Sequence, residues 1–430
     1  MGSLKIYNKK LKGEVNIPPS KSMAHRAVIC AALAKGTSII NNIDLSDDII
    51  ATINGMRSLG AVITINNNSL EIIGASNESR SYDRLIDCNE SGSTLRFLVP
   101  IALLFEGENR FIGKGNLGKR PLNIYYDIFE KQGIKYSYKE ETLDLVTEGI
   151  LSPGTFKVRG DVSSQFITGL MLSLPLLNGD SKIIIEGKLE SKGYLDLTLS
   201  AMKDFSVNIE NKDYKEFIIK GNQSYIGREY KVCGDYSQGA FFLCADAINN
   251  EVTCMDLDED SLQGDKEVIE ILERMGVSFN RKNDSIIGNA LNLKGTVIDA
   301  AGCPDIIPIL SVVASLSNGR TEIINCKRLR IKECDRLSAI REELTKLGAI
   351  IKEEGDSLII DGVDKLKGGV TVWSHKDHRI AMMLSIAATR CEEPIILEDY
   401  ECVSKSYPHF FEDFKMLGGD LKWVECLEII

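Results

Sequence analysis

A helix-stop pattern that recurs six times constrains the fold of this chain more than any other feature. Each copy is a helix-like segment that ends in Leu-Gly or a similar pair, followed by two short alternating strands around a polar turn. Glycine is the usual residue just past a helix C-terminus, and one copy has serine there. The spacing predicts six units of one design. The stop positions lie 70 to 73 residues apart, at Gly60, Gly133, Ser206, Gly276, Gly348 and Gly418.

Each unit is expected to contain one apolar helix, one amphipathic helix and several short strands. The apolar helices are nearly free of charge after their first turn, as core helices are. Units of this length are too long for a solenoid, so we group them three and three into an α/β fold of two domains. The expected domains are 18–233 and 1–17 with 234–430, and a first strand within 4–17 should pair with the second domain. The apolar helices are expected at 20–34, 91–104, 163–177, 236–248, 304–316 and 377–389.

The composition excludes several classes of partner. The net charge is -11, so we expect neither nucleic acid nor an acidic membrane surface as a partner. No apolar run is long enough to span a bilayer. The 11 cysteines are scattered without a Cys-x-x-Cys pair, which is typical of a reduced cytoplasmic protein. His375 and His378 hint at a metal site, but the sequence offers no Cys or acidic cluster near them, so we expect no metal.

Cations gather at the expected helix starts of this acidic chain. A single Ser or Asp cap explains one polar residue at each start, but a helix N-terminus disfavours cations unless an anion binds there. We therefore expect a cleft for a substrate that carries several phosphates or carboxylates. Asp305 and Glu333 would lie inside it, ionised and suited to act as bases. The cations are Lys21, Arg26, Arg96, Arg120, Lys332, Arg336, Arg379 and Lys405.

Other chemistries lack their motifs in this sequence. It shows no Cys or Ser nucleophile paired with a base, no glycine-rich dinucleotide loop, no P-loop and no metal cluster. Hydride transfer, kinase chemistry and metal-dependent hydrolysis are therefore disfavoured.

Nine polar stretches, in this order, resemble the 5-enolpyruvylshikimate-3-phosphate (EPSP) synthase family over essentially the whole chain. Any one stretch is a weak signal, but the ordered set is highly specific. The stretches are Pro19-Ser20-Lys21-Ser22 with Arg26, Gly92 to Arg96, Lys119-Arg120-Pro121, Ser163-Ser164-Gln165-Phe166, Ser191-Lys192-Gly193-Tyr194, Pro304-Asp305, Lys332-Glu333 with Asp335-Arg336, Asp377-His378-Arg379, and Lys405 in Val-Ser-Lys-Ser-Tyr-Pro.

The resemblance implies a fold of two domains, each of three βαβαββ units in an inside-out α/β barrel, with the active site in the interdomain cleft. It implies transfer of the enolpyruvyl group of phosphoenolpyruvate to the 5-hydroxyl of shikimate 3-phosphate, with release of phosphate. This step belongs to chorismate and aromatic amino-acid synthesis. No metal or organic cofactor is implied, and we expect a cytoplasmic monomer.

The resemblance also assigns roles to residues of this chain. Asp305 would take the 5-hydroxyl proton, Glu333 would protonate the methylene carbon and later remove a proton, and Lys21 would stabilise charge on the phosphate oxygen. Phosphoenolpyruvate would be held by Lys21, Gly92, Arg120, Gln165, Arg336, Arg379 and Lys405. Shikimate 3-phosphate would be held by Lys21, Ser22, Arg26, Ser163, Ser164, Gln165, Tyr194, Asp305 and Lys332.

Two positions depart from the commonest family pattern, and two rival functions remain open. Asn89-Glu90-Ser91 stands where many members have Gly-Asn-Ala or Gly-Asn-Ser, and this departure leaves the inhibitor response open. Gly92 itself is kept, which in the family accompanies room for glyphosate beside the phosphoenolpyruvate site. Arg328 stands where some members have a substrate-binding Asn, and a contact from Arg328 or Ser191 is likewise open. A sister enzyme that acts on a UDP-sugar would be expected to carry a reactive Cys near position 118, where this chain has none. A binding-only protein would not need Asp305 and Glu333.

Overall fold

The computed structural model describes residues 2–75, 83–139, 141–189, 192–282, 285–290 and 292–424. Contacts divide the chain into two compact units. The first, called the split unit here, is Met1–Pro18 with Gly234–Ile430, and the second, called the middle unit, is Pro19–Cys233. That these units are the two expected domains, 18–233 and 1–17 with 234–430, stays a prediction. Among the described residues, no helix has both the length and the apolarity needed to cross a membrane.

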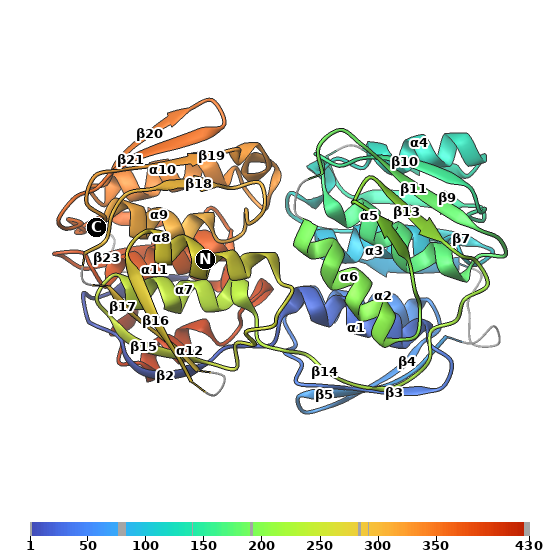
Figure 1. Ribbon diagram of the computed structural model, residues 1–430, viewed down its shortest axis with the longest axis horizontal. Coiled ribbons are helices and arrows are strands. Elements are labelled where there is room, and N and C mark those ends of the chain that lie inside the picture. Colours follow the sequence, from blue (N-terminus) through green and yellow to red (C-terminus); the bar gives the residue numbers. More distant parts are fainter. Residues whose placement is uncertain are drawn as a thin grey trace. The chain divides into compact units, whose positions relative to one another are not determined.

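The apolar helices form close to their expected positions, and nearly all of their residues are buried. In each unit they lie in the centre, surrounded by that unit's sheets (Figure 1). The largest differences are at α5, where a 3-10 turn η3 (Leu174–Leu176) replaces the last helical turn, and at α9, which begins three residues late. The six helices are α1 (Lys21–Leu33), α3 (Gly92–Ala102), α5 (Ser164–Ser173), α7 (Tyr236–Ala247), α9 (Ile307–Ser315) and α11 (His378–Ala388).

The second helices carry one buried face, as their amphipathic sequences predict. They are α2 (Asp47–Ser58), α4 (Asn123–Gln132), α6 (Lys192–Asp204), α8 (Glu267–Arg274), α10 (Arg336–Lys346) and α12 (Phe410–Met416). Within the described part of the chain, short 3-10 turns precede four of them, at η2 (Leu117–Lys119), η4 (Gly264–Lys266), η5 (Cys326–Ile331) and η6 (Tyr400–Lys405).

The described strands form six four-stranded sheets of one topology, in which the first two strands are parallel and the later neighbours are antiparallel. The middle unit holds β14 (Glu229–Lys231)-β3 (Thr37–Asn41)-β5 (Ser69–Ile73)-β4 (Val62–Asn66), β6 (Asp83–Asp87)-β7 (Glu108–Ile112)-β9 (Asp144–Glu148)-β8 (Lys135–Tyr138), and β10 (Thr155–Arg159)-β11 (Ser181–Glu186)-β13 (Glu216–Ile219)-β12 (Glu210–Lys212). The split unit holds β2 (Lys12–Asn16)-β15 (Glu251–Met255)-β17 (Ser285–Ala290)-β16 (Val277–Lys282), β18 (Val297–Asp299)-β19 (Arg320–Ile324)-β21 (Ser357–Asp361)-β20 (Ile350–Glu354), and β22 (Thr371–Trp373)-β23 (Ile395–Glu398)-β1 (Ser3–Ile6)-β24 (Leu421–Val424).

The N-terminal segment differs from the single strand expected there. It forms two strands that enter different sheets: β1 lies between β23 and β24, and β2 pairs with β15. Both partners belong to the split unit, as expected. The break between β1 and β2 lets Leu4, Ile6, Leu11 and Val15 all reach the core with no exposed surface.

The six helix-stop positions share one backbone conformation, which confirms the repeat. Each lies in the left-handed region, with φ between 69° and 100°. Ser206 adopts it too, with φ 70°, although a side chain makes this region unfavourable. The position therefore keeps its geometry even where the residue type departs from glycine.

Candidate active site

Arg336 is the centre of a buried charged group in the split unit. It is the first residue of α10 and only 1% exposed. Its Nη1 donates to Asp305 Oδ1 at 2.7 Å, and its Nη2 donates to Glu333 Oε2 at 2.7 Å. Its Nε donates to Asp377 Oδ2, also at 2.7 Å. A buried guanidinium is tolerable only when it is paired in this way, so the three carboxylates and the arginine fix one another.

Asp305 lies in the connection before α9 and is surrounded by cations. Lys332 Nζ lies 2.9 Å from its Oδ1, and Arg379 Nη2 lies 3.7 Å from its Oδ2. Arg379 also donates from Nη1 to the Asp305 carbonyl at 3.0 Å. Burial alone would raise the pKa of Asp305, but Lys332, Arg379 and Arg336 outweigh it and hold that pKa well below its usual range.

The neighbouring cations complete this group. Lys405, at the end of η6, lies 3.8 Å from Glu333 Oε1 and is buried. Burial lowers the pKa of Lys332 to about 8, against the opposing effect of Asp305. We call the set the Asp305 cluster. Its members are Asp305, Lys332, Glu333, Arg336, Arg379 and Lys405.

In the middle unit, Lys21 begins α1 and forms an ion pair with a residue of α2. Its Nζ lies 3.0 Å from Asp48 Oδ2, and both side chains are largely buried. The Asp48 carbonyl accepts a hydrogen bond from Thr94 Oγ1 at 3.3 Å, so Asp48 also ties the start of α3 to this site. Ser20 caps α1 by accepting from Met23 N, as its place in the sequence predicts.

Gly92 lies against three polar side chains of the middle unit. Arg96 Nη1 donates to Gln165 Oε1 at 2.6 Å, and Gln165 Nε2 donates to Ser93 Oγ at 2.9 Å. A Cβ on Gly92 would lie 2.5 Å from Arg120 Nη1 and 3.1 Å from Arg96 Nη1. Glycine is therefore required for the two guanidinium groups to approach this helix start so closely. The structure thus brings together Gly92, Arg120 and Gln165, which are three of the residues expected to hold phosphoenolpyruvate.

Arg26 has a larger structural role than its sequence position indicates. Its Nε donates to Thr198 Oγ1 at 2.8 Å, Nη1 to the Ser22 carbonyl at 2.6 Å and Nη2 to the Tyr194 carbonyl at 2.8 Å. The bonds to Thr198 and Tyr194 join α1 to α6, and the bond to Ser22 lies within α1. Arg26, Ser22 and Tyr194 therefore lie together. The expected residues Ser163 and Ser164 occupy the start of α5, where Ser163 Oγ accepts from Gln165 N.

Two carboxylates that hold predicted substrate-binding side chains were not identified in this role from the sequence. Asp48 holds Lys21, and Asp377 holds Arg336 while capping α11. Both occur at helix starts, where an Asp is expected as an ordinary cap, so the sequence gives no signal that separates the two roles. Arg96 was among the expected cations but not among the residues expected to bind substrate, and in the structure it donates to Gln165.

The surroundings of His375, Ser191 and Arg328 were left open or misjudged by the sequence. The expectation that no acidic cluster lies near His375 was wrong, because Nε2 of His375 lies 2.9 Å from Glu343 Oε1. The chain separation of 32 residues hides this pair from any motif search. Ser191 lies outside the described residues. Arg328 is buried in η5 and contributes to the lowered pKa of Lys332.

Known proteins resemble this chain along its whole length. The sequence model of the family EPSP synthase (3-phosphoshikimate 1-carboxyvinyltransferase) matches residues 7–414. A 3-phosphoshikimate 1-carboxyvinyltransferase of Clostridium botulinum (strain Alaska E43 / Type E3) is 67% identical over 425 residues, which are 98% of each chain. Its counterpart in Clostridioides difficile (strain 630) is 66% identical over 428 residues, which cover 97% of this chain and 98% of the relative.

A solved structure shares the fold. EPSP synthase from Acinetobacter baumannii matches with a TM-score of 0.82 at 24% identity, covering 99% of this chain and 100% of that one. At this identity the likeness speaks for the fold alone, and it confirms the expected α/β class. The family match and the two close relatives carry the assignment further. This chain belongs to the EPSP synthase family.

Proposed function

We propose that this chain transfers the enolpyruvyl group of phosphoenolpyruvate to the 5-hydroxyl of shikimate 3-phosphate and releases phosphate. Membership of the family supports the reaction. The geometry of Arg336 supports it most directly, because one buried guanidinium binds both carboxylates that the reaction needs, Asp305 and Glu333. Both carboxylates stand among cations that can neutralise anionic substrates before they meet.

The substrate contacts follow the two groups of side chains. Phosphoenolpyruvate is held by Lys21, Gly92, Arg120, Gln165, Arg336, Arg379 and Lys405. Shikimate 3-phosphate is held by Lys21, Ser22, Arg26, Ser163, Ser164, Gln165, Tyr194, Asp305 and Lys332. Each set draws on both units, so one substrate pair must engage both at once. The middle unit and the split unit then act as the two domains of a monomer.

Asp305 removes the proton from the 5-hydroxyl. In the free protein its pKa is too low for a strong base, because burial is outweighed by Lys332, Arg379 and Arg336. Substrate phosphate and carboxylate groups compete for the same cations. Their binding therefore raises the pKa of Asp305 at the moment when the hydroxyl arrives.

In its protonated form, Glu333 gives a proton to the methylene carbon of phosphoenolpyruvate while the 5-hydroxyl oxygen bonds to the adjacent carbon and Asp305 takes the hydroxyl proton. Glu333 then takes a proton back from the same carbon as the C–O bond to phosphate breaks, and the proton on Asp305 leaves with the released phosphate. Its carboxylate is oriented by Arg336 Nη2 at 2.7 Å and faces Lys405 at 3.8 Å. Lys21 stabilises the charge on the departing phosphate oxygen. None of these steps requires a metal or an organic cofactor.

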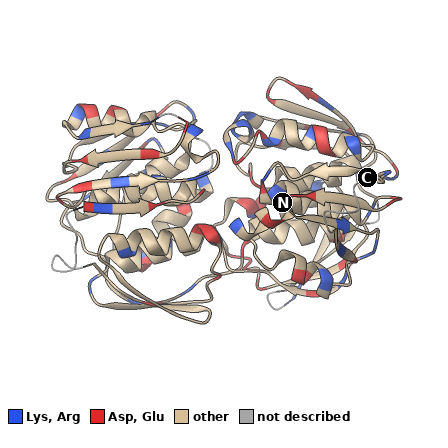
Figure 2. Cartoon of the chain, turned by 180° about the vertical axis from the view of Figure 1, so that it is seen from behind, with Lys and Arg blue, Asp and Glu red and all other residues tan. Residues whose placement is uncertain are grey.

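The distribution of charged residues and the state of the cysteines bear on the partners and the compartment of this chain. Acidic and basic side chains are interspersed along the ribbon of each unit (Figure 2), which suits small anionic substrates better than a nucleic-acid backbone. Ten described cysteines are free thiols, which is typical of the cytoplasm.

The test is a phosphate-release assay with three acceptors. Phosphoenolpyruvate with shikimate 3-phosphate is expected to release phosphate, while phosphoenolpyruvate alone or with a UDP-sugar is not. Release with the UDP-sugar instead would favour the sister activity, and no release with any acceptor would favour a binding protein.

A pH dependence follows from Lys332. Burial lowers its pKa to about 8 in the free protein, so the ammonium is charged below that pH and becomes neutral above it. KM for shikimate 3-phosphate is therefore expected to rise by about threefold to tenfold as the pH passes upward through 8, because one cation of the site is lost. Lys332→Arg keeps its charge and should show no such rise. If KM in Lys332→Arg rose across pH 8 as steeply as in the unmodified chain, this prediction would be wrong.

A further inference from the structure

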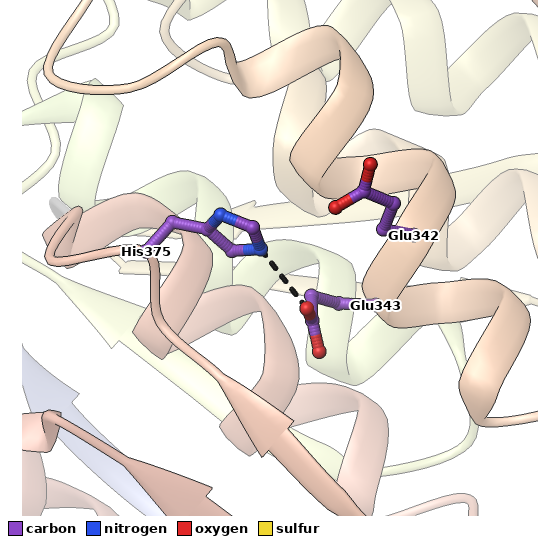
Figure 3. A group of neighbouring side chains, drawn as sticks. All are labelled: Glu342, Glu343 and His375. Atoms are coloured by element: carbon purple, nitrogen blue, oxygen red, sulfur yellow. Dashed lines mark hydrogen bonds and ion pairs between the residues drawn. The ribbon is translucent and has the colours of Figure 1, made fainter.

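The helix that carries Arg336 contacts the segment before α11 at a second point. Glu343 lies seven residues after Arg336, which places both side chains on one face of α10. Glu343 is 1% exposed, and its Oε2 accepts from Trp373 N at 3.0 Å while its Oε1 lies 2.9 Å from His375 Nε2 (Figure 3). The turn that ends at Asp377 is thus fastened to α10 at both ends.

This turn is strained. His375 and Lys376 have φ values of 52° and 55°, so two consecutive residues with side chains lie in the left-handed region. Such residues are disfavoured and persist only where neighbouring contacts enforce them. Ser374 Oγ supplies one such contact, since it accepts from Lys376 N at 3.1 Å and donates to the Asp399 carbonyl at 3.0 Å.

The strain is located directly before a functional residue. Asp377 follows Lys376, has no exposed surface, and accepts from Arg336 Nε and from Arg379 N. A small change in the path of the turn would therefore move the carboxylate that orients Arg336. The ring of His375 also packs on Trp373, with 4.3 Å between the ring centroids.

The same side chains offer ligand atoms that suit a metal, but they carry no metal proposal. Atoms of Glu342, Glu343 and His375 lie within 4.8 Å of one another. Both oxygens of Glu343 already accept from Lys346 Nζ, at 2.8 and 2.9 Å. A lysine ammonium thus already supplies the positive charge that a metal would bring.

We propose that Glu343 and His375 are positioning residues, which hold the 374–377 turn so that Asp377 presents Arg336 to phosphoenolpyruvate. The inference rests on the proposed function of Arg336. Neither residue touches substrate. They act through the turn and Asp377 on Arg336. Their loss should therefore change KM for phosphoenolpyruvate more than KM for shikimate 3-phosphate.

Steady-state kinetics of His375→Ala test this proposal. Loss of a hydrogen bond to a buried carboxylate should raise KM for phosphoenolpyruvate about tenfold. KM for shikimate 3-phosphate should stay within about twofold and kcat within about threefold. His375→Gln, whose amide can reach Glu343, should recover much of the loss. Lys346→Met removes a different partner of the same carboxylate and leaves the turn alone, so it should leave KM for phosphoenolpyruvate unchanged.

The outcomes separate the two proposals. If the unmodified chain is active and His375→Ala leaves KM for phosphoenolpyruvate unchanged, the positioning role is wrong. Equal losses for both substrates in His375→Ala would also overturn it, because they indicate general damage to the fold. An inactive unmodified chain would instead refute the proposed function.

Discussion

Glu333→Gln is expected to lower kcat by about 10²- to 10⁴-fold, the usual contribution of a positioned acid or base. The amide oxygen can still accept from Arg336 Nη2, so the 2.7 Å bond and the local fold should survive. The amide cannot, however, deliver or remove the proton at the methylene carbon. Phosphoenolpyruvate binding should change little, because Lys405 and Arg336 remain. Phosphate release under saturating substrates measures the first effect and calorimetric titration measures the second.

Glu353→Gln is the matched control for this variant. Glu353 also binds arginines, with Arg330 Nη2 at 2.7 Å and Arg341 Nε at 3.1 Å, but it lies outside the Asp305 cluster. Its kcat should equal that of the unmodified chain. If Glu333→Gln turned over as fast as this control, Glu333 would have no part in proton transfer.

Arg336→Met should destabilise the chain by about 3–5 kcal/mol, because it leaves the fully buried Asp377 and the largely buried Asp305 and Glu333 without their shared cation. Asp305, Glu333 and Asp377 each lose a hydrogen bond of 2.7 Å. Arg336→Lys keeps the charge but not the planar fork, so it should be less damaging to stability while still impairing phosphoenolpyruvate binding. Denaturant unfolding measures the loss of stability in both variants, and calorimetric titration with phosphoenolpyruvate measures the loss of binding.

Arg330→Met provides the comparison for Arg336→Met. Arg330 also bonds to three carboxylates, but its side chain is 29% exposed against 1% for Arg336. Water can replace its partners, so the expected loss is roughly 1 kcal/mol or less. Equal losses in the two methionine variants would contradict the view that burial makes the Arg336 network costly to break.

Much of the fold could be predicted from the sequence because it repeats. The residue just past each amphipathic helix has a left-handed backbone conformation, and it is glycine in five of six units. Each buried helix appears in the sequence as a long run without charged residues. The N-terminal strands could not be assigned in the same way. β1 enters the sheet of β23 and β24 from the other end of the chain, and no local pattern encodes such a pairing.

The cations of the candidate site and the carboxylates Asp305 and Glu333 could be predicted from the sequence, but the carboxylates that hold Lys21 and Arg336 could not. A lysine or arginine at a helix start is unusual and attracts notice, as Lys21 and Arg379 do. An aspartate in or just before a first helical turn is ordinary, so its residue type gives no sign that Asp48 holds Lys21 or that Asp377 holds Arg336. The contact between Glu343 and His375 depends on how α10 packs against the chain before α11, which the sequence pattern does not specify.

The KM for phosphoenolpyruvate at saturating shikimate 3-phosphate tests the central claim most directly, when it is measured by phosphate release on one variant from each unit. Lys21→Met alters the middle unit and Arg379→Met alters the split unit. If one substrate pair engages both units, each variant should raise this KM at least about tenfold. Lys182→Met, which removes an exposed ion pair with Glu216, should have the KM of the unmodified chain. An unchanged KM in either Lys21→Met or Arg379→Met would contradict the account.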